Sequence, residues 1–94
     1  MELVEAVNAL PKSVHGISDA LVEAGVRGSR QSRDFCPIAV WLSDQVDSRV
    51  LVGKQTCFID KVEADIILLP HDVMVWVSRF DLGVAPRQEE LLAT

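Results

Sequence analysis

The spacing of the apolar residues changes at residue 49 and changes back at residue 70, and this alternation constrains the fold more than any other feature of the chain. Outside this stretch, apolar residues recur every three or four positions, which is the period of a helix with one buried face. Within it, short runs rich in β-branched residues are separated by turn-forming or charged residues, as in strands. Because a small sheet must bury one face, we predict an α+β fold, a three-stranded antiparallel meander packed against about four short helices.

Caps and helix breakers set the expected limits of these elements. We expect a short helix that ends before Pro11, a helix over residues 13–25 that starts at Ser13, a helix that starts at Pro37, strands in 49–53, 56–60 and 65–69, a helix from Pro70 to Gly83, and a turn with a frayed helical tail over 84–94.

A chain of 94 residues has room for one hydrophobic core, so we expect a single domain over residues 1–94. Six residues lie on the apolar sectors expected for the third and fourth helices, and we assign them to this core: Phe35, Ile38, Leu42, Val73, Val77 and Phe80.

The formal net charge of −5 opposes general attraction to nucleic acids and to anionic membranes. No apolar run approaches the roughly 18–20 residues that cross a bilayer, and the first residues carry acids where a secretory signal carries bases. We therefore predict a cytoplasmic protein with no membrane insertion.

Two chemical hypotheses involve the cysteines. Cys36 precedes an expected helix N-terminus, where positive potential lowers a thiol pKa, but no histidine lies at a spacing that identifies a catalytic base. Cys36, Cys57, His15 and His71 have side chains that suit zinc, but they are scattered along the chain without the close pairs of structural zinc sites. We predict free thiols, no metal, no cofactor and no enzymatic activity, and the sequence identifies no small-molecule ligand.

Residues 26–34 combine glycine, serine and arginine without apolar periodicity, and we interpret them as an exposed loop. Arg27, Arg30 and Arg33 recur at intervals of three, a composition that binds phosphate in other loops. No P-loop motif and no interleaved aromatic residue accompanies them. The arginines give a nucleic-acid-associated regulator as the alternative function.

The third and fourth helices carry more apolar residues than one buried stripe needs. Val40, Trp41, Val75 and Leu82 lie at the margin of the stripe or opposite to it. A helix that is apolar on most sides is either sandwiched within its domain or shared with a partner. We assign these four residues to a contact surface for another protein chain, with burial in the domain as the open alternative.

Several short motifs support a resemblance. Residues 25–28 (GVRG), 36–42 (CPIAVWL), 69–70 (LP) and 79–83 (RFDLG), followed by Pro86, occur in this order. They resemble the Gly-apolar-x-Gly, Cys-Pro-Leu-Ala-x-aromatic-Leu, Leu-Pro and Arg-Phe-Asp-x-Gly motifs of a family of small, mostly uncharacterised proteins from actinobacteria and their bacteriophages, including mycobacteriophages. The likeness covers residues 13–88, and the chain departs from it at Val40 and at residues 84–85.

That family has no assigned enzyme activity, so the resemblance implies a phage or actinobacterial cytoplasm and no particular reaction. Together with the surplus apolar residues, it favours a small non-enzymatic interaction module. The expected partner is another protein chain, either a host protein that a phage factor modulates or a second copy.

Overall fold

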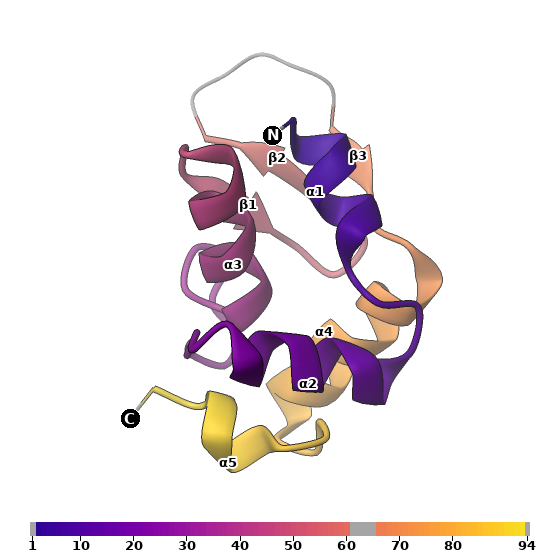
Figure 1. Cartoon of the computed structure of the whole chain (residues 1–94), viewed down its shortest axis with the longest axis vertical. Coiled ribbons are helices and arrows are strands. Elements are labelled where there is room, and N and C mark those ends of the chain that lie inside the picture. The colour runs from indigo at the N-terminus through magenta and orange to yellow at the C-terminus, as the bar shows by residue number, and fades with distance from the viewer. Residues whose placement is uncertain (1, 61–65, 94) are drawn as a thin grey trace.

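The computed structural model describes residues 2–60 and 66–93, and in these ranges it confirms the predicted α+β fold (Figure 1). The elements in chain order are α1 (Leu3–Ala9), α2 (Val14–Glu23), α3 (Pro37–Val46), β1 (Val50–Val52), β2 (Thr56–Ile59), β3 (Ile67–Leu68), α4 (His71–Leu82) and α5 (Gln88–Leu91). Asp65, the first residue of the predicted third strand, lies outside the described residues.

The helix ends follow the capping residues in the sequence. The Ser13 hydroxyl accepts a hydrogen bond from the Gly16 amide at 3.0 Å, so it caps α2 as predicted. Pro37 occupies the first turn of α3, where its missing amide costs nothing. Gly83 ends α4 with a left-handed φ of 82°, a conformation that glycine adopts without strain.

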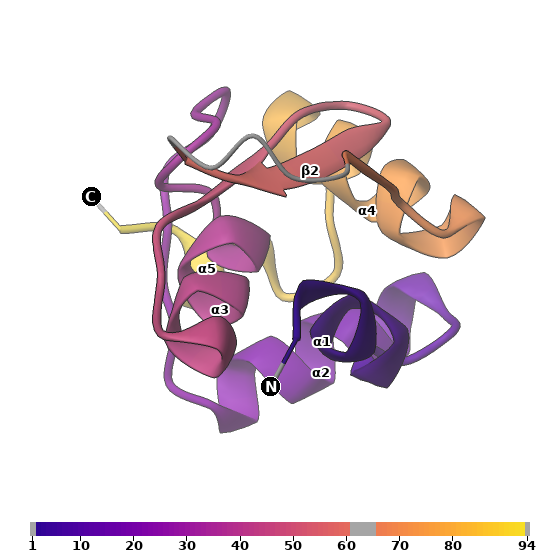
Figure 2. The same ribbon diagram turned by 90° about the horizontal axis from the view of Figure 1, so that it is seen from above.

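The three strands form an antiparallel sheet in the order β1-β2-β3. Val52 pairs with Cys57, and Cys57 pairs with Ile67. Since side chains alternate along a strand, these residues share one face of the sheet. Helices α1, α2 and α3 lie on one side of the sheet and of α4, as Figure 2 shows.

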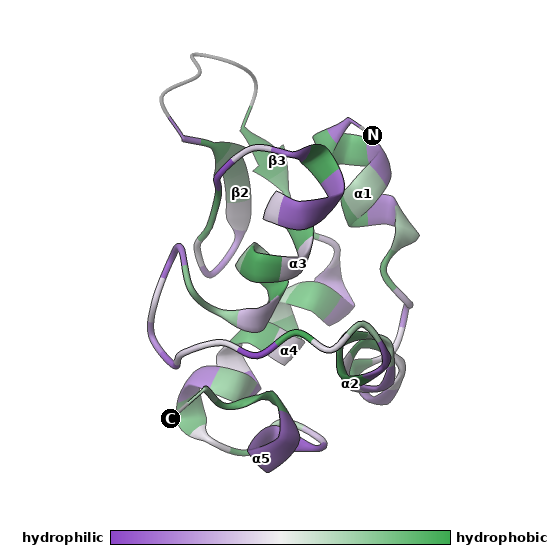
Figure 3. Ribbon diagram, turned by 60° about the vertical axis from the view of Figure 1, so that its left-hand side comes forward, coloured by the Kyte–Doolittle hydropathy of each residue, from purple (hydrophilic) through white to green (hydrophobic). Residues whose placement is uncertain are grey.

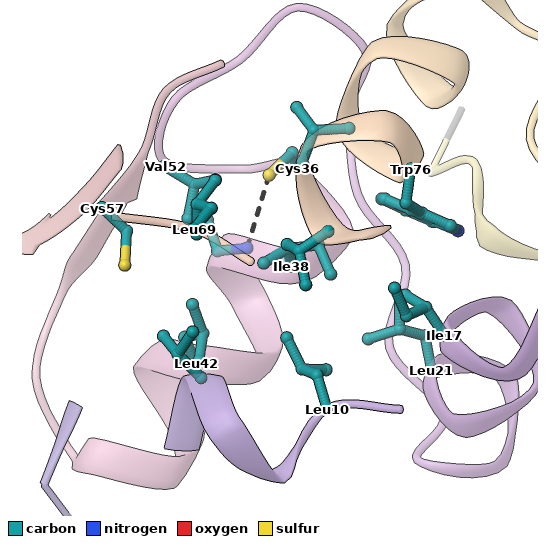
Figure 4. Close-up of a cluster of buried hydrophobic side chains, with 14 of the residues drawn as sticks. Leu10, Ile17, Leu21, Cys36, Ile38, Leu42, Val52, Cys57, Leu69 and Trp76 are labelled. Carbon is teal, nitrogen blue, oxygen red and sulfur yellow. Dashed lines mark hydrogen bonds between the residues drawn. The ribbon is translucent and has the colours of Figure 1, made fainter. Parts of the chain in front are cut away.

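The core fills the space between these two layers (Figure 4). Of the six predicted core residues, all except Phe35 are buried. The assignment of Phe35 is wrong: its side chain is 62% exposed, because α3 begins at Pro37 and Phe35 lies in the preceding turn. The helical periodicity therefore does not extend to Phe35.

The C-terminal segment forms a turn followed by the helix α5, in agreement with a helical tail, but it packs on the domain and is not frayed as predicted. Leu91 is fully buried on α5, and Leu92 forms a parallel bridge with Gly28. The Gly28 amide donates to the Leu91 carbonyl at 2.8 Å, and the Ala93 amide donates to the Gly28 carbonyl at 2.8 Å. Residues 91–93 are thus fixed by the chain that follows α2.

Among the described residues, no helix combines the length and the hydropathy needed to cross a lipid bilayer.

Candidate functional site

A cavity of about 570 Å³ lies between the loop that precedes α3, the turn that joins β1 to β2, and the C-terminal half of α4. Cys36, Val52, Val77 and Leu82 supply apolar lining, and Arg33 and Lys54 supply cations. The volume falls within the range of roughly 300–1,000 Å³ that is typical of ligand sites. This combination of an apolar lining with a few polar groups makes the cavity the candidate binding site of the chain.

Hydrogen bonds fix the loop on one side of the cavity to α4 on the other. The Arg30 guanidinium donates to the Asp81 carbonyl oxygen through Nε at 3.0 Å and Nη2 at 2.8 Å. The Gln31 amide donates to Asp81 Oδ1 at 2.8 Å. Arg30 therefore stabilises the C-terminal end of α4, where backbone carbonyls lack helical partners.

The same loop is also fixed to the sheet. The Val52 amide donates to the Arg33 carbonyl oxygen at 2.7 Å, so the outer edge of β1 is occupied by the loop backbone. Farther along, a Cβ at Gly28 would lie 2.3 Å from the Phe35 carbonyl oxygen and 2.4 Å from the Pro37 nitrogen. Only glycine allows this close backbone approach. The loop backbone around Arg33 is therefore fixed by its hydrogen bond to β1 and by the close backbone packing at Gly28.

Charge is unevenly distributed around the cavity. Among the described residues, Arg33 and Lys54 form no ion pair, whereas Arg49 pairs with Asp34 and with Asp60. The hydrogen bond from Arg49 holds the pKa of Asp34 below its usual range. The charge of Arg49 is thus balanced within the chain, while the two cations that line the cavity have no carboxylate partner there.

Asp81 also lines the cavity, and one of its carboxylate oxygens accepts the Gln31 amide. The lining thus contains two cations and one carboxylate, which makes this a locally positive site in a protein of net charge −5.

Cys36 has a structural role at the start of α3. Its sulfur accepts a hydrogen bond from the Ala39 amide at 3.4 Å and so caps α3 (Figure 4). Burial raises the pKa of the Cys36 thiol to about 11, so the nucleophilic thiolate is disfavoured at neutral pH. Cys57 is also buried and unbridged, with its pKa raised by burial to about 11.

The four residues considered for zinc lie in different surroundings. His15 and His71 are exposed on α2 and α4, while Cys36 and Cys57 are buried. Within residues 2–60 and 66–93, no three histidine, cysteine or acidic side chains are grouped so that they would hold a metal ion.

The four residues assigned to a partner surface differ in exposure. Leu82 is 72% exposed at the end of α4 and lines the cavity. Val40, Trp41 and Val75 are partly buried, and Trp41 packs against the hydrophobic core. Leu82 is thus the member of this set that the structure places at the candidate site.

The three arginines of the loop also differ in their surroundings. Arg30 is bonded to α4, Arg33 lines the cavity, and Arg27 is exposed near Glu90, whose pKa is lowered mainly by its hydrogen bond with Arg87. The structure therefore brings Arg33 and Leu82, taken from two different functional hypotheses, to the lining of one cavity.

Two features of this region were missed by the sequence analysis. Lys54 and Ser78 also line the cavity, but they belong to a turn and to a helix that the chain separates by more than twenty residues, and no local motif joins them. Only the packing of α4 beside the β1–β2 turn brings them together.

A second exposed apolar surface lies on the sheet face that the helices leave open. Leu51 and Phe58 pair on this face, and Leu68 pairs with Thr56 at its edge, with 69% of the Leu68 side chain exposed. The colouring by hydropathy shows β3 as a hydrophobic segment (Figure 3). The period-two spacing of Leu51 against buried Val50 and Val52 is the sequence signal for this face.

Comparisons of this chain with protein-family models, with curated proteins and with solved structures gave no match.

Proposed function

We propose that this chain is a small non-enzymatic protein-interaction module that binds a segment of another protein chain at the cavity beside Leu82. The observation that carries the proposal is a large apolar side chain, mostly exposed, at the lining of a cavity of about 570 Å³. Exposed apolar residues are ordinary when they are scattered, but they mark binding sites when they adjoin a concave apolar surface.

The motif resemblance supports a finer form of the proposal, in which a phage factor binds and modulates a cytoplasmic protein of its host. The alternative, a nucleic-acid-associated regulator that uses residues 27–33, has weaker support, because the Arg30 guanidinium is occupied by the Asp81 carbonyl. These two bonds to a neutral carbonyl oxygen use two of the five N–H donors of Arg30, so fewer donors of the loop remain for phosphate oxygens.

The test compares Leu82→Asp with Leu68→Asp, which introduces the same charge at a similarly exposed leucine on the sheet. Each variant and the wild-type chain would be immobilised and exposed to bacterial cytoplasm, and captured proteins would be quantified by mass spectrometry. We expect specific capture by the wild-type chain and by Leu68→Asp, and its loss with Leu82→Asp. Unchanged melting temperatures would show that all three proteins are folded. Equal capture by the two variants would refute the cavity as the binding site.

A further inference from the structure

The residues that line the cavity also define the chemistry of its occupant. We infer that the cavity binds an acidic segment of a partner protein, with an apolar side chain of that segment against Leu82 and Val77 and its carboxylates near Arg33 and Lys54. This inference rests on the proposed function, because it names the ligand class of the same site.

The charges of the cavity lining indicate an acidic ligand. Arg33 and Lys54 come from separate segments, one before α3 and one in the β1–β2 turn, yet both line the same cavity without an ion-pair partner among the described residues. By contrast, Arg87 is bound by Asp19 at 3.2 Å and by Glu90 at 2.6 Å. The cations of the cavity are therefore available to an external anion, and a basic ligand would meet like charge there.

The apolar part of the lining favours a peptide ligand over a nucleic acid. Val52, Val77 and the Cys36 side chain are buried beneath the site, and Leu82 is exposed beside it. Sites for single-stranded nucleic acid typically stack bases on aromatic rings, but the residues that line this cavity include none. An apolar side chain flanked by carboxylates satisfies both parts of the lining.

Hydrogen bonds that involve the backbone form this site before its ligand binds. The bonds from Arg30 and Gln31 to Asp81, and from Val52 to Arg33, fix the loop, the helix and the strand relative to one another. A preformed site loses less conformational entropy on binding than one that must be ordered by its ligand.

The experiment uses the isotopically labelled full chain and follows its backbone amide signals by NMR during titration with three blocked hexapeptides. One has two central leucines flanked by acidic residues, the second has the same leucines flanked by lysines, and the third is acidic with central glycines. We expect the first peptide to shift the amides of Ser32, Gly53 and Ser78, with weaker effects from the other two and weaker binding at high salt. A ten-nucleotide single-stranded DNA serves as the nucleic-acid probe.

Charge reversal provides the decisive comparison. In the variant Arg33→Glu/Lys54→Glu we expect affinity for the acidic peptide to fall about threefold to tenfold, the effect of two solvent-exposed ion pairs, and the lysine-flanked peptide to become preferred. The control variant Lys12→Glu/Arg79→Glu makes the same change in net charge at exposed residues outside the cavity lining, and it should bind as the wild type does.

The outcomes separate this inference from the proposed function. No shifts with the acidic peptide, equal shifts with all three peptides, or tighter binding of the DNA at these amides would each overturn the ligand class. If capture of a host protein depends on Leu82 but is unaffected by Arg33→Glu/Lys54→Glu, the interaction module stands and the acidic ligand is refuted. If capture is indifferent to Leu82, the proposed function itself fails.

Discussion

Replacement of Ser18 by alanine should destabilise the domain, although the change is small and conservative. The Trp76 indole nitrogen donates to the Ser18 hydroxyl at 2.8 Å, and both residues are fully buried. Ser18 is the one buried polar residue in the described part of the chain, and it lies on α2 opposite α4. In the Ser18→Ala variant the indole N–H would therefore remain in the core without an acceptor.

The expected loss follows from two opposing effects. An unsatisfied buried donor costs about 1–3 kcal/mol, whereas alanine in a helix interior gains up to roughly 0.5 kcal/mol over serine. The free energy of unfolding should then fall by about 0.5–2.5 kcal/mol, which for a domain of this size lowers Tm by about 4–8 °C for each kcal/mol. Thermal and urea unfolding would be followed by circular dichroism.

A control and a double-mutant cycle make this prediction refutable. Ser48→Ala removes an exposed hydroxyl and should leave Tm within about 1–2 °C of the wild type. In the background of Trp76→Phe, which removes the indole donor, Ser18→Ala should cost little. A Ser18→Ala variant as stable as Ser48→Ala, or an equal cost in both backgrounds, would contradict the role assigned to this hydrogen bond.

Three further predictions follow from burial and ionisation. Burial raises the pKa of both thiols to about 11 from an ordinary 9.0, so the unfolded chain releases these protons at a lower pH than the folded chain, and stability to urea should fall as the pH rises from 9 to 11. The chain has no tyrosine that would titrate in this range, and the stability of a Cys36→Ala/Cys57→Ala variant should depend less steeply on pH. Phe80→Ala should lower the free energy of unfolding by about 3–5 kcal/mol, whereas Phe35→Ala, at an exposed residue, should lower it by less than about 1 kcal/mol. Similar urea midpoints for the two variants would refute the burial of Phe80 and the exposure of Phe35. Leu91→Ala should cost about 2–5 kcal/mol, and a Tm like that of the wild type would restore the frayed tail.

The helices and the sheet were predictable because their signals are local. Ser13, Pro37 and Gly83 act at the ends of their own helices through backbone geometry that neighbouring residues determine. The packing of the C-terminal helix on the domain had no such signal. Leu91 is buried by contact with residues near Gly28, more than sixty positions earlier, and a charged sequence such as that of residues 87–90 indicates exposure when taken alone.

The candidate site was predictable only in part, because its residues come from segments that lie far apart in the sequence. Sequence reasoning identified Leu82 as a surplus apolar residue and Arg33 as a loop cation, but it assigned them to rival functions. Their common cavity depends on the docking of the loop against α4 through Arg30 and Asp81, a pairing of residues that are 51 positions apart. The bonds from Arg30 also use N–H donors that a count of arginines in the sequence assigns to a phosphate ligand.

The residues that carry the motif resemblance have roles in the framework of this cavity. Gly28 allows the backbone to approach the start of the CPIAVWL motif, and within RFDLG Asp81 accepts the loop while Gly83 ends α4. Leu82 occupies the one variable position of Arg-Phe-Asp-x-Gly, and Arg33 and Lys54 lie outside the motifs. In this chain Gly28, Asp81 and Gly83 thus help to shape the walls of the cavity, while Arg33, Lys54 and Leu82 give it two cations and an exposed apolar side chain.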